Sequence, residues 1–152
     1  MTRSERMAPV QRVLGSTERD RARDMGTAQQ ALSAAESKLR DLQQYYADYQ
    51  QGFQESARAG QNALRLRDFQ LFLARLETAV RQQEQVVAQA RAGVAGSTQR
   101  WQSAAQRVKA VDSVVGKWQQ DEMRRTDRLE QKETDERASR RTGSRTTGTE
   151  QE

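Results

Sequence analysis

The chain has 152 residues and a formal net charge of +5, and only 34% of its residues are apolar. It is too poor in Leu, Val, Ile and Phe for an ordinary globular core, whereas its abundant Ala, Glu, Gln, Leu and Arg and its single proline are typical of long helices or coiled coils. Because there is no Cys and no His, disulfides and the usual zinc or iron ligands are excluded, and we expect no metal and no cofactor.

Basic and acidic side chains alternate along the whole chain, most densely in 121–128. This pattern favours a solvated helix surface over a basic patch, so we expect no nucleic acid among the partners despite the positive net charge. No apolar run is long enough to cross a bilayer, and no apolar stretch of a signal peptide follows the charged first residues. We therefore expect a cytoplasmic protein.

Residues 14–53 carry the first helical pattern. Alternate steps of four and three residues from Leu14 meet an apolar side chain at ten of twelve positions. These positions are Leu14, Glu18, Arg21, Met25, Ala28, Leu32, Ala35, Leu39, Leu42, Tyr46, Tyr49 and Phe53. The spacing predicts one helix over about 9–57 with an apolar seam along one side.

The segment 56–62 interrupts this pattern with small and polar residues. Gly60 can adopt the positive φ that ends a helix, and Asn62 is a suitable N-cap for a following one. We therefore predict a turn at about 58–62.

A second seam begins at Leu66 and is apolar at fifteen of nineteen positions. Its positions are Leu66, Phe69, Leu73, Leu76, Val80, Gln83, Val87, Ala90, Val94, Ser97, Trp101, Ala104, Val108, Val111, Val115, Trp118, Glu122, Arg125 and Leu129. The pattern predicts a second, longer helix over about 63–138, and its sustained heptad period indicates left-handed supercoiling.

Two such helices joined by a short turn fold back on each other, so the predicted fold is all-α, a single antiparallel coiled-coil hairpin over 1–138. In the register that the turn sets, Gly26 faces Gly96, which predicts a soft or closely approached middle segment. The same register places Arg21 opposite Trp101, where a guanidinium lying on the indole ring would tolerate a charge on the seam. Residues 139–152 have no apolar period, and we expect a disordered tail.

The second helix is predicted to run beyond the start of the first. Val114, Val115 and Trp118 would then lack an intramolecular cover, and exposed apolar side chains on an unpaired helix suggest a binding partner. The alternative is that residues 1–13 fold alongside them and hide them.

No sequence pattern points to catalysis. There is no Gly-rich phosphate-binding loop, and the carboxylate pairs at helical spacing, such as Asp20 and Asp24, stand beside arginines as ordinary surface pairs do. We therefore expect no enzyme, no catalytic residue and no small-molecule substrate.

Several blocks of the sequence resemble the FliJ family of flagellar type III export proteins. They are the tyrosines Tyr45 and Tyr49 after Leu42, the Phe- and Leu-rich block 69–80, Trp101, and the charged ending 127–138. The resemblance spans nearly the whole chain. It implies an antiparallel coiled coil similar to the central stalk, the gamma subunit, of rotary ATPases.

The resemblance also implies partners. Proteins of this family insert their terminal end into the hexameric export ATPase FliI, contact the export gate protein FlhA and cycle export chaperones, at the cytoplasmic face of the inner membrane at the flagellar base. Carried over by position, the gate-binding residues are Leu42, Tyr45, Tyr49, Phe72, Leu76 and Ala79. The end that contains Val114, Val115 and Trp118 is the candidate contact with the ATPase ring.

Two of the gate-binding residues, Tyr45 and Phe72, lie off the predicted seams, so core packing does not explain them. For Leu42, Tyr49 and Leu76, which lie on the seams, a plain core role is at least as good an explanation as binding. Two alternative functions stay open: the equivalent stalk of a virulence-type secretion system, and a basic coiled coil that binds nucleic acid.

Overall fold

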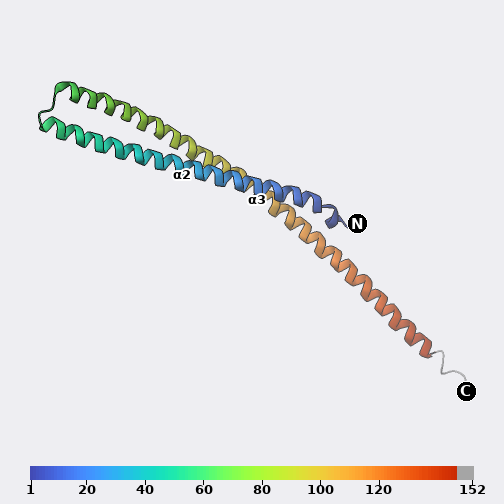
Figure 1. Cartoon of the computed structure of the whole chain (residues 1–152). Helices are drawn as coiled ribbons and strands as arrows, with labels where there is room; N and C mark the ends of the chain where they lie inside the picture. Colours follow the sequence, from blue (N-terminus) through green and yellow to red (C-terminus); the bar gives the residue numbers. More distant parts are fainter. Residues whose placement is uncertain (147–152) are drawn as a thin grey trace, which may run out of the picture. The chain divides into compact units, whose positions relative to one another are not determined.

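The structure is a computed structural model that describes residues 1–146, with side chains through 145. These residues form three helices and no strand: α1 (Arg3–Arg6), α2 (Ala8–Arg58) and α3 (Ala63–Thr146). The two long helices run side by side in opposite directions from the turn that joins them (Figure 1). The predicted all-α antiparallel hairpin is confirmed. The long helices begin and end within one residue of the predicted bounds, except at the end of α3.

The turn has the local chemistry that the sequence indicates. Gly60 has a φ of +73°, and the amide of Gln61 donates to the carbonyl of Ser56 at 3.1 Å while the amide of Gly60 donates to that of Ala57 at 3.3 Å. These two bonds form a Schellman motif, which satisfies the last carbonyls of α2. Asn62 caps α3, because its Oδ1 accepts from the amide of Leu64 at 2.9 Å.

The contacts divide the chain into two compact units. The hairpin unit comprises Thr17–Ala105. The terminal unit comprises Met1–Ser16 and Gln106–Glu152, of which residues through 146 are described. Because α2 and α3 run through both units, each unit contains part of both helices.

In the hairpin unit, every buried side chain is a predicted seam residue. They are Ala35 on α2 and Gln83, Val87, Ser97 and Ala104 on α3. The predicted seams are therefore confirmed as the line along which the helices pack.

Several polar seam residues have hydrogen-bond partners in the hairpin unit. Gln83 Nε2 donates to the carbonyl oxygen of Ala35 at 3.0 Å, and Trp101 Nε1 donates to Glu18 Oε1 at 2.8 Å. The expectation that Arg21 lies on Trp101 is wrong, since Arg21 instead pairs with Asp24 at 3.4 Å within α2. Glu18 is therefore the hydrogen-bond partner of the Trp101 indole N–H.

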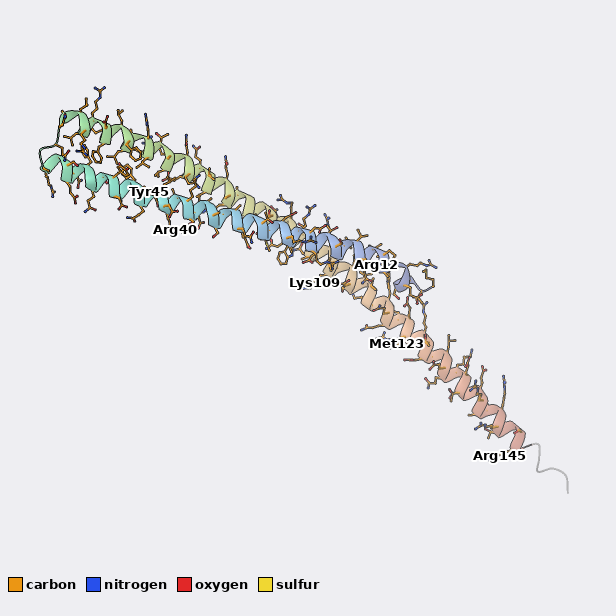
Figure 2. All side chains as sticks on the ribbon, in the orientation of Figure 1. Arg12, Arg40, Tyr45, Lys109, Met123 and Arg145 are labelled. Carbon is orange, nitrogen blue, oxygen red and sulfur yellow. The ribbon has the colours of Figure 1, made fainter. Side chains whose placement is uncertain are left out.

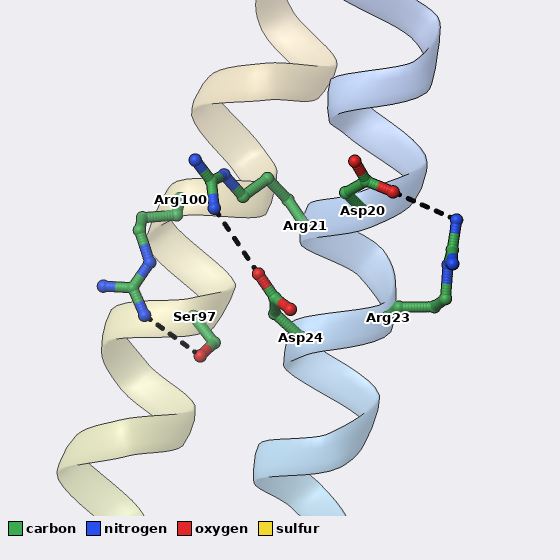
Figure 3. Close-up of polar contacts among 6 residues, drawn as sticks. All are labelled: Asp20, Arg21, Arg23, Asp24, Ser97 and Arg100. Carbon is green, nitrogen blue, oxygen red and sulfur yellow. Dashed lines mark hydrogen bonds and ion pairs between the residues drawn. The ribbon is translucent and has the colours of Figure 1, made fainter.

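Charged side chains border the seam on both sides, and on one side the pair Arg91–Glu36 joins the two helices. Figure 3 shows Arg21 and Asp24 of α2 on the side of the hairpin where Ser97 and Arg100 of α3 also lie. On the opposite side, Arg91 Nη2 stands 3.9 Å from Glu36 Oε1. In heptad letters the seam residues occupy positions a and d, and these two sides are the g flank and the e flank of the hairpin.

The glycines of the middle segment are not sites of close approach. A Cβ built on Gly26 or on Gly93 meets no atom within 4 Å, and one on Gly96 meets only the side chain of Arg100. The expected close approach is therefore absent, and the glycines leave open space beside the helices.

In the terminal unit, the first residues cover part of the α3 seam. Val115 is only 2% exposed, and residues of the first segment contact α3 on either side of it, Gln11 at Asp112 and Ser4 at Glu122. The expectation that Val115 lacks an intramolecular cover is therefore wrong, and the alternative that residues 1–13 fold alongside α3 is correct there. The first segment includes a separate short helix, α1, and Pro9 lies in the first turn of α2.

Helix α3 continues to Thr146, eight residues past the expected end at Ala138, so residues 139–146 are helical rather than a disordered tail. Hydroxyl groups support this last stretch from within, since Thr142 Oγ1 donates to the carbonyl of Ala138 at 2.6 Å. No proline interrupts it. The rest of the expected tail, 147–152, lies outside the described residues.

Candidate functional site

An aromatic patch lies in the hairpin unit near the turn. The rings of Tyr49 and Phe72 are 4.4 Å apart between centroids and tilted by 38°, and Phe69 stands 6.2 Å from Tyr49 and 6.3 Å from Phe53. These distances are those of interacting aromatic pairs. The patch thus joins the last turns of α2 to the first turns of α3.

Three of the six expected gate-binding residues present large exposed surfaces in or beside this patch. Tyr45 is 58% exposed, and Tyr49 and Phe72 are 39% exposed each; Figure 2 shows Tyr45 on α2. Tyr49 is a seam residue, and its exposure removes the plain core explanation for it. Leu42, Leu76 and Ala79 are half-buried.

The structure brings Tyr49 and Phe72 together directly. Tyr45 is one helical turn before Tyr49 on α2, and it lines a shallow groove of about 340 Å³ with Asp41, Gln44 and Asp48. A second groove of about 350 Å³ runs over the ring pair and is lined by Tyr49, Arg65, Asp68, Phe69 and Phe72.

Two exposed leucines near the turn were missed by the sequence analysis. Leu64 is 68% exposed and Leu71 is 53% exposed. The sequence does indicate them, since both are apolar residues outside the seam positions in a chain with few apolar residues.

The three residues expected to contact the ATPase ring have different environments in the terminal unit. Val115 is buried on the seam, Trp118 is half-buried, and Val114 is 42% exposed. The guanidinium of Arg3 lies 4.3 Å from the centroid of the Trp118 ring, a cation–π contact. Of the three, Val114 is therefore exposed over the largest fraction of its surface.

Helix α1 is anchored to α3 through a single carboxylate. Glu122 accepts two hydrogen bonds from Ser4, one from the hydroxyl at 2.6 Å and one from the backbone amide at 3.1 Å. The hydroxyl bond first, and then the amide bond, hold the pKa of Glu122 below its ordinary value. Thr2 and Glu5 close a capping box around the start of α1.

This anchor was not anticipated from the sequence, although Glu122 appears there as a polar exception on the second seam. A groove of about 480 Å³ runs beside it, lined by Thr2, Arg3, Trp118, Asp121, Glu122, Arg125 and Thr126. Beyond Glu122, every residue of α3 from 123 to 145 is exposed.

Neither a metal centre nor a membrane span is found in the part of the chain that the structure describes. Its acidic side chains form no group of three that could hold a metal ion. None of its helices is both long and apolar enough to cross a bilayer.

Comparison with protein-family models matches residues 3–147 to the family described as flagellar FliJ protein. Neither curated proteins nor solved structures give a match. The family match spans nearly the whole chain, as the resemblance in the sequence implied. This chain belongs to the FliJ family and is a flagellar export-related protein.

Proposed function

We propose that this protein is the central stalk of the hexameric flagellar export ATPase, and that it also contacts the export gate protein and cycles export chaperones. It acts by being bound and performs no chemistry of its own. It associates with the membrane only through these partners. The family match is the observation that carries the proposal.

The hairpin architecture supports the stalk role. The two long helices, of 51 and 84 residues, pack against each other along their seams. A part that turns or seats inside a ring has to be stiff, and a continuous seam supplies that stiffness.

The exposed aromatic patch supports the gate contact. Tyr45, Tyr49 and Phe72 are large aromatic side chains that the seam does not bury, and aromatic residues are enriched at the centres of protein interfaces. We propose that these three, flanked by Leu42, Leu76 and Ala79, bind the gate protein.

The terminal unit supports the ring contact. Val114 is the exposed member of the expected set, Trp118 is partly accessible, and Val115 acts by holding the seam beneath them. The helix beyond Glu122 then projects further exposed side chains, among them Met123 and Leu129.

The experiment measures ATP turnover by the export ATPase of the same cell, with the full chain and with chains cut after Glu122 or after Val111. The cut after Glu122 keeps the Ser4 anchor, whereas the cut after Val111 removes Val114, Val115 and Trp118. We expect the full chain to stimulate turnover and the shorter cut chain to fail. Absence of stimulation by the full chain would contradict the stalk role.

Thermal melts of both cut chains serve as the control. Removing 123–152 should leave the melting midpoint unchanged, because the described residues it removes are all exposed. If the cut after Glu122 stimulates as the full chain does, the ring contact lies within the first 122 residues.

A further inference from the structure

The terminal unit has a flank on which exposed valines and unpaired cations occur together. Val10 and Val114 are each 42% exposed, and Val13 is 65% exposed. Exposed apolar side chains that lie together on a helix surface mark an interaction site.

Heptad positions place these valines on one side. Val10 and Val114 both directly precede an a position, so both occupy g positions, and Val13 occupies the neighbouring c position. In an antiparallel pair the g positions of the two helices border the same side of the seam. The register of this unit agrees, since Gln11 Nε2 donates to Asp112 Oδ1 at 2.9 Å.

The same g and c positions of α3 carry an excess of positive charge. Between 107 and 128 they are Arg107, Ala110, Val114, Lys117, Asp121, Arg124 and Arg128. Four of these seven are cations and one is an anion. None of the four cations has an ion pair or a hydrogen bond to another side chain among the described residues.

The opposite flank of α3 over the same stretch is electrically balanced. Its e and b positions carry one cation, Lys109, and one anion, Asp112, and the latter already accepts a hydrogen bond from Gln11. The positive charge is therefore a property of the valine-bearing flank and not of the helix as a whole.

We infer that this flank, made of Val10, Val13, Val114, Arg107 and Lys117 with Arg124 and Arg128 beyond, is a docking surface for an acidic protein segment with an apolar stripe. The positive charge of the flank favours an acidic partner. The exposed valines favour a polypeptide, which can offer apolar side chains, over a purely anionic polymer. The inference rests on the proposed function, in that it gives the chemistry of the ring surface that meets this unit.

Electrostatics at such a flank acts mainly on association and specificity. Charges at an interface rim steer encounter and fix register, and their effect falls as salt rises. The valines supply apolar contact that salt does not weaken. Binding should accordingly show both a salt-dependent part and a salt-resistant part.

The first test compares two double charge reversals in the full chain. Arg107→Glu with Lys117→Glu alters the flank. Arg12→Glu with Lys109→Glu makes the same change in net charge at exposed b positions, which border the opposite side of the seam; both residues are labelled in Figure 2. We expect the flank variant to raise the half-saturating concentration for ATPase stimulation about tenfold, and the control to change it by less than about twofold. Equal effects of the two variants would overturn the inference while leaving the stalk role standing.

A matched valine pair tests the apolar part. Val114→Ser is compared with Val86→Ser, because Val86 is a g-position valine of similar exposure, 46%, in the hairpin unit. Only Val114→Ser should weaken stimulation. Circular dichroism melts confirm that each variant is folded.

A final arm does not depend on the ATPase. Short synthetic helical peptides with a leucine stripe flanked either by glutamates or by lysines are titrated against the full chain. We expect the glutamate peptide to bind about tenfold more tightly, and the flank reversal alone to abolish the preference. The inference fails if the peptides bind equally, or if a short DNA duplex binds the flank more tightly than the glutamate peptide at physiological salt.

Discussion

Individual side chains determine which parts of the two long helices are free to bind a partner. Tyr49 lies on the seam and yet is 39% exposed, and its ring packs on that of Phe72, a residue of α3 beside the seam, at 4.4 Å between centroids. Phe72 occupies a g position, so its ring covers the flank of the seam near the turn. Phe72 is therefore expected to contribute modestly to stability, and 39% of its surface is exposed to a partner.

Phe72→Ala should therefore lower the free energy of unfolding by only about 1 kcal/mol, the scale of one exposed aromatic pair. It should weaken binding to the export gate protein about tenfold. Titration with the purified gate domain measures the binding and chemical denaturation measures the stability. Leu71→Ala is the control, since Leu71 is exposed but points away from the seam at an f position; an equal loss of binding in Leu71→Ala would contradict the patch.

Glu122 gives the terminal unit a dependence on pH. Its folded-state pKa lies below the ordinary value of 4.5, so its bonds to Ser4 stabilise the folded state above that pH. The contribution is lost as the pH falls below about 4.5 and through the lower folded pKa. The amide of Ser4, which donates to the carboxylate, should report this loss by its NMR shift.

In Glu122→Gln the acid transition of the Ser4 amide should disappear, because the amide side chain does not titrate. Helix α1 should also exchange its amide protons faster in that variant at neutral pH. A Ser4 amide that titrates identically in both proteins would contradict the anchor.

At the scale of whole elements, the two helices are long because nothing in them stops a helix. The only proline is in the first turn of α2, and the one glycine with positive φ among the described residues is in the turn itself. Gly26, Gly93 and Gly116 sit inside the helices, where they cost conformational entropy although a Cβ there would meet no atom within 4 Å.

Gly26→Ala and Gly93→Ala should each raise the stability of the hairpin by up to about 1 kcal/mol. A Cβ at either position meets no atom within 4 Å, so the gain in helix propensity is not offset by a clash. Thermal melts measure the effect. Gly60→Ala is the opposing control and should destabilise, because Gly60 has a φ of +73°; a destabilised Gly26→Ala would mean that the space beside Gly26 serves a required approach.

For the molecule as a whole, stability is spread along the seam. Only seven of the described residues are buried, and three of those are polar. Of the four ion pairs among the described residues, only Arg91–Glu36 joins two helices, and exposed pairs of this kind contribute little. The many half-buried seam residues therefore hold the helices together, and the surfaces that flank the seam are left for partners.

The sequence by itself determined the helices, the turn and the seam. The heptad period, the positive φ of Gly60 and the N-cap at Asn62 depend only on residues that are close together in the sequence. It also carried the family resemblance. The exposure of Tyr49 and the cover over Val115 were decided only by the tertiary structure. Both depend on contacts between residues far apart in the sequence. These are the ring contact between Tyr49 and Phe72 and the hydrogen bond between Ser4 and Glu122, which no local sequence pattern predicts. The flank that joins Val10 to Val114 emerged for the same reason, from the register of two helices that are distant in sequence.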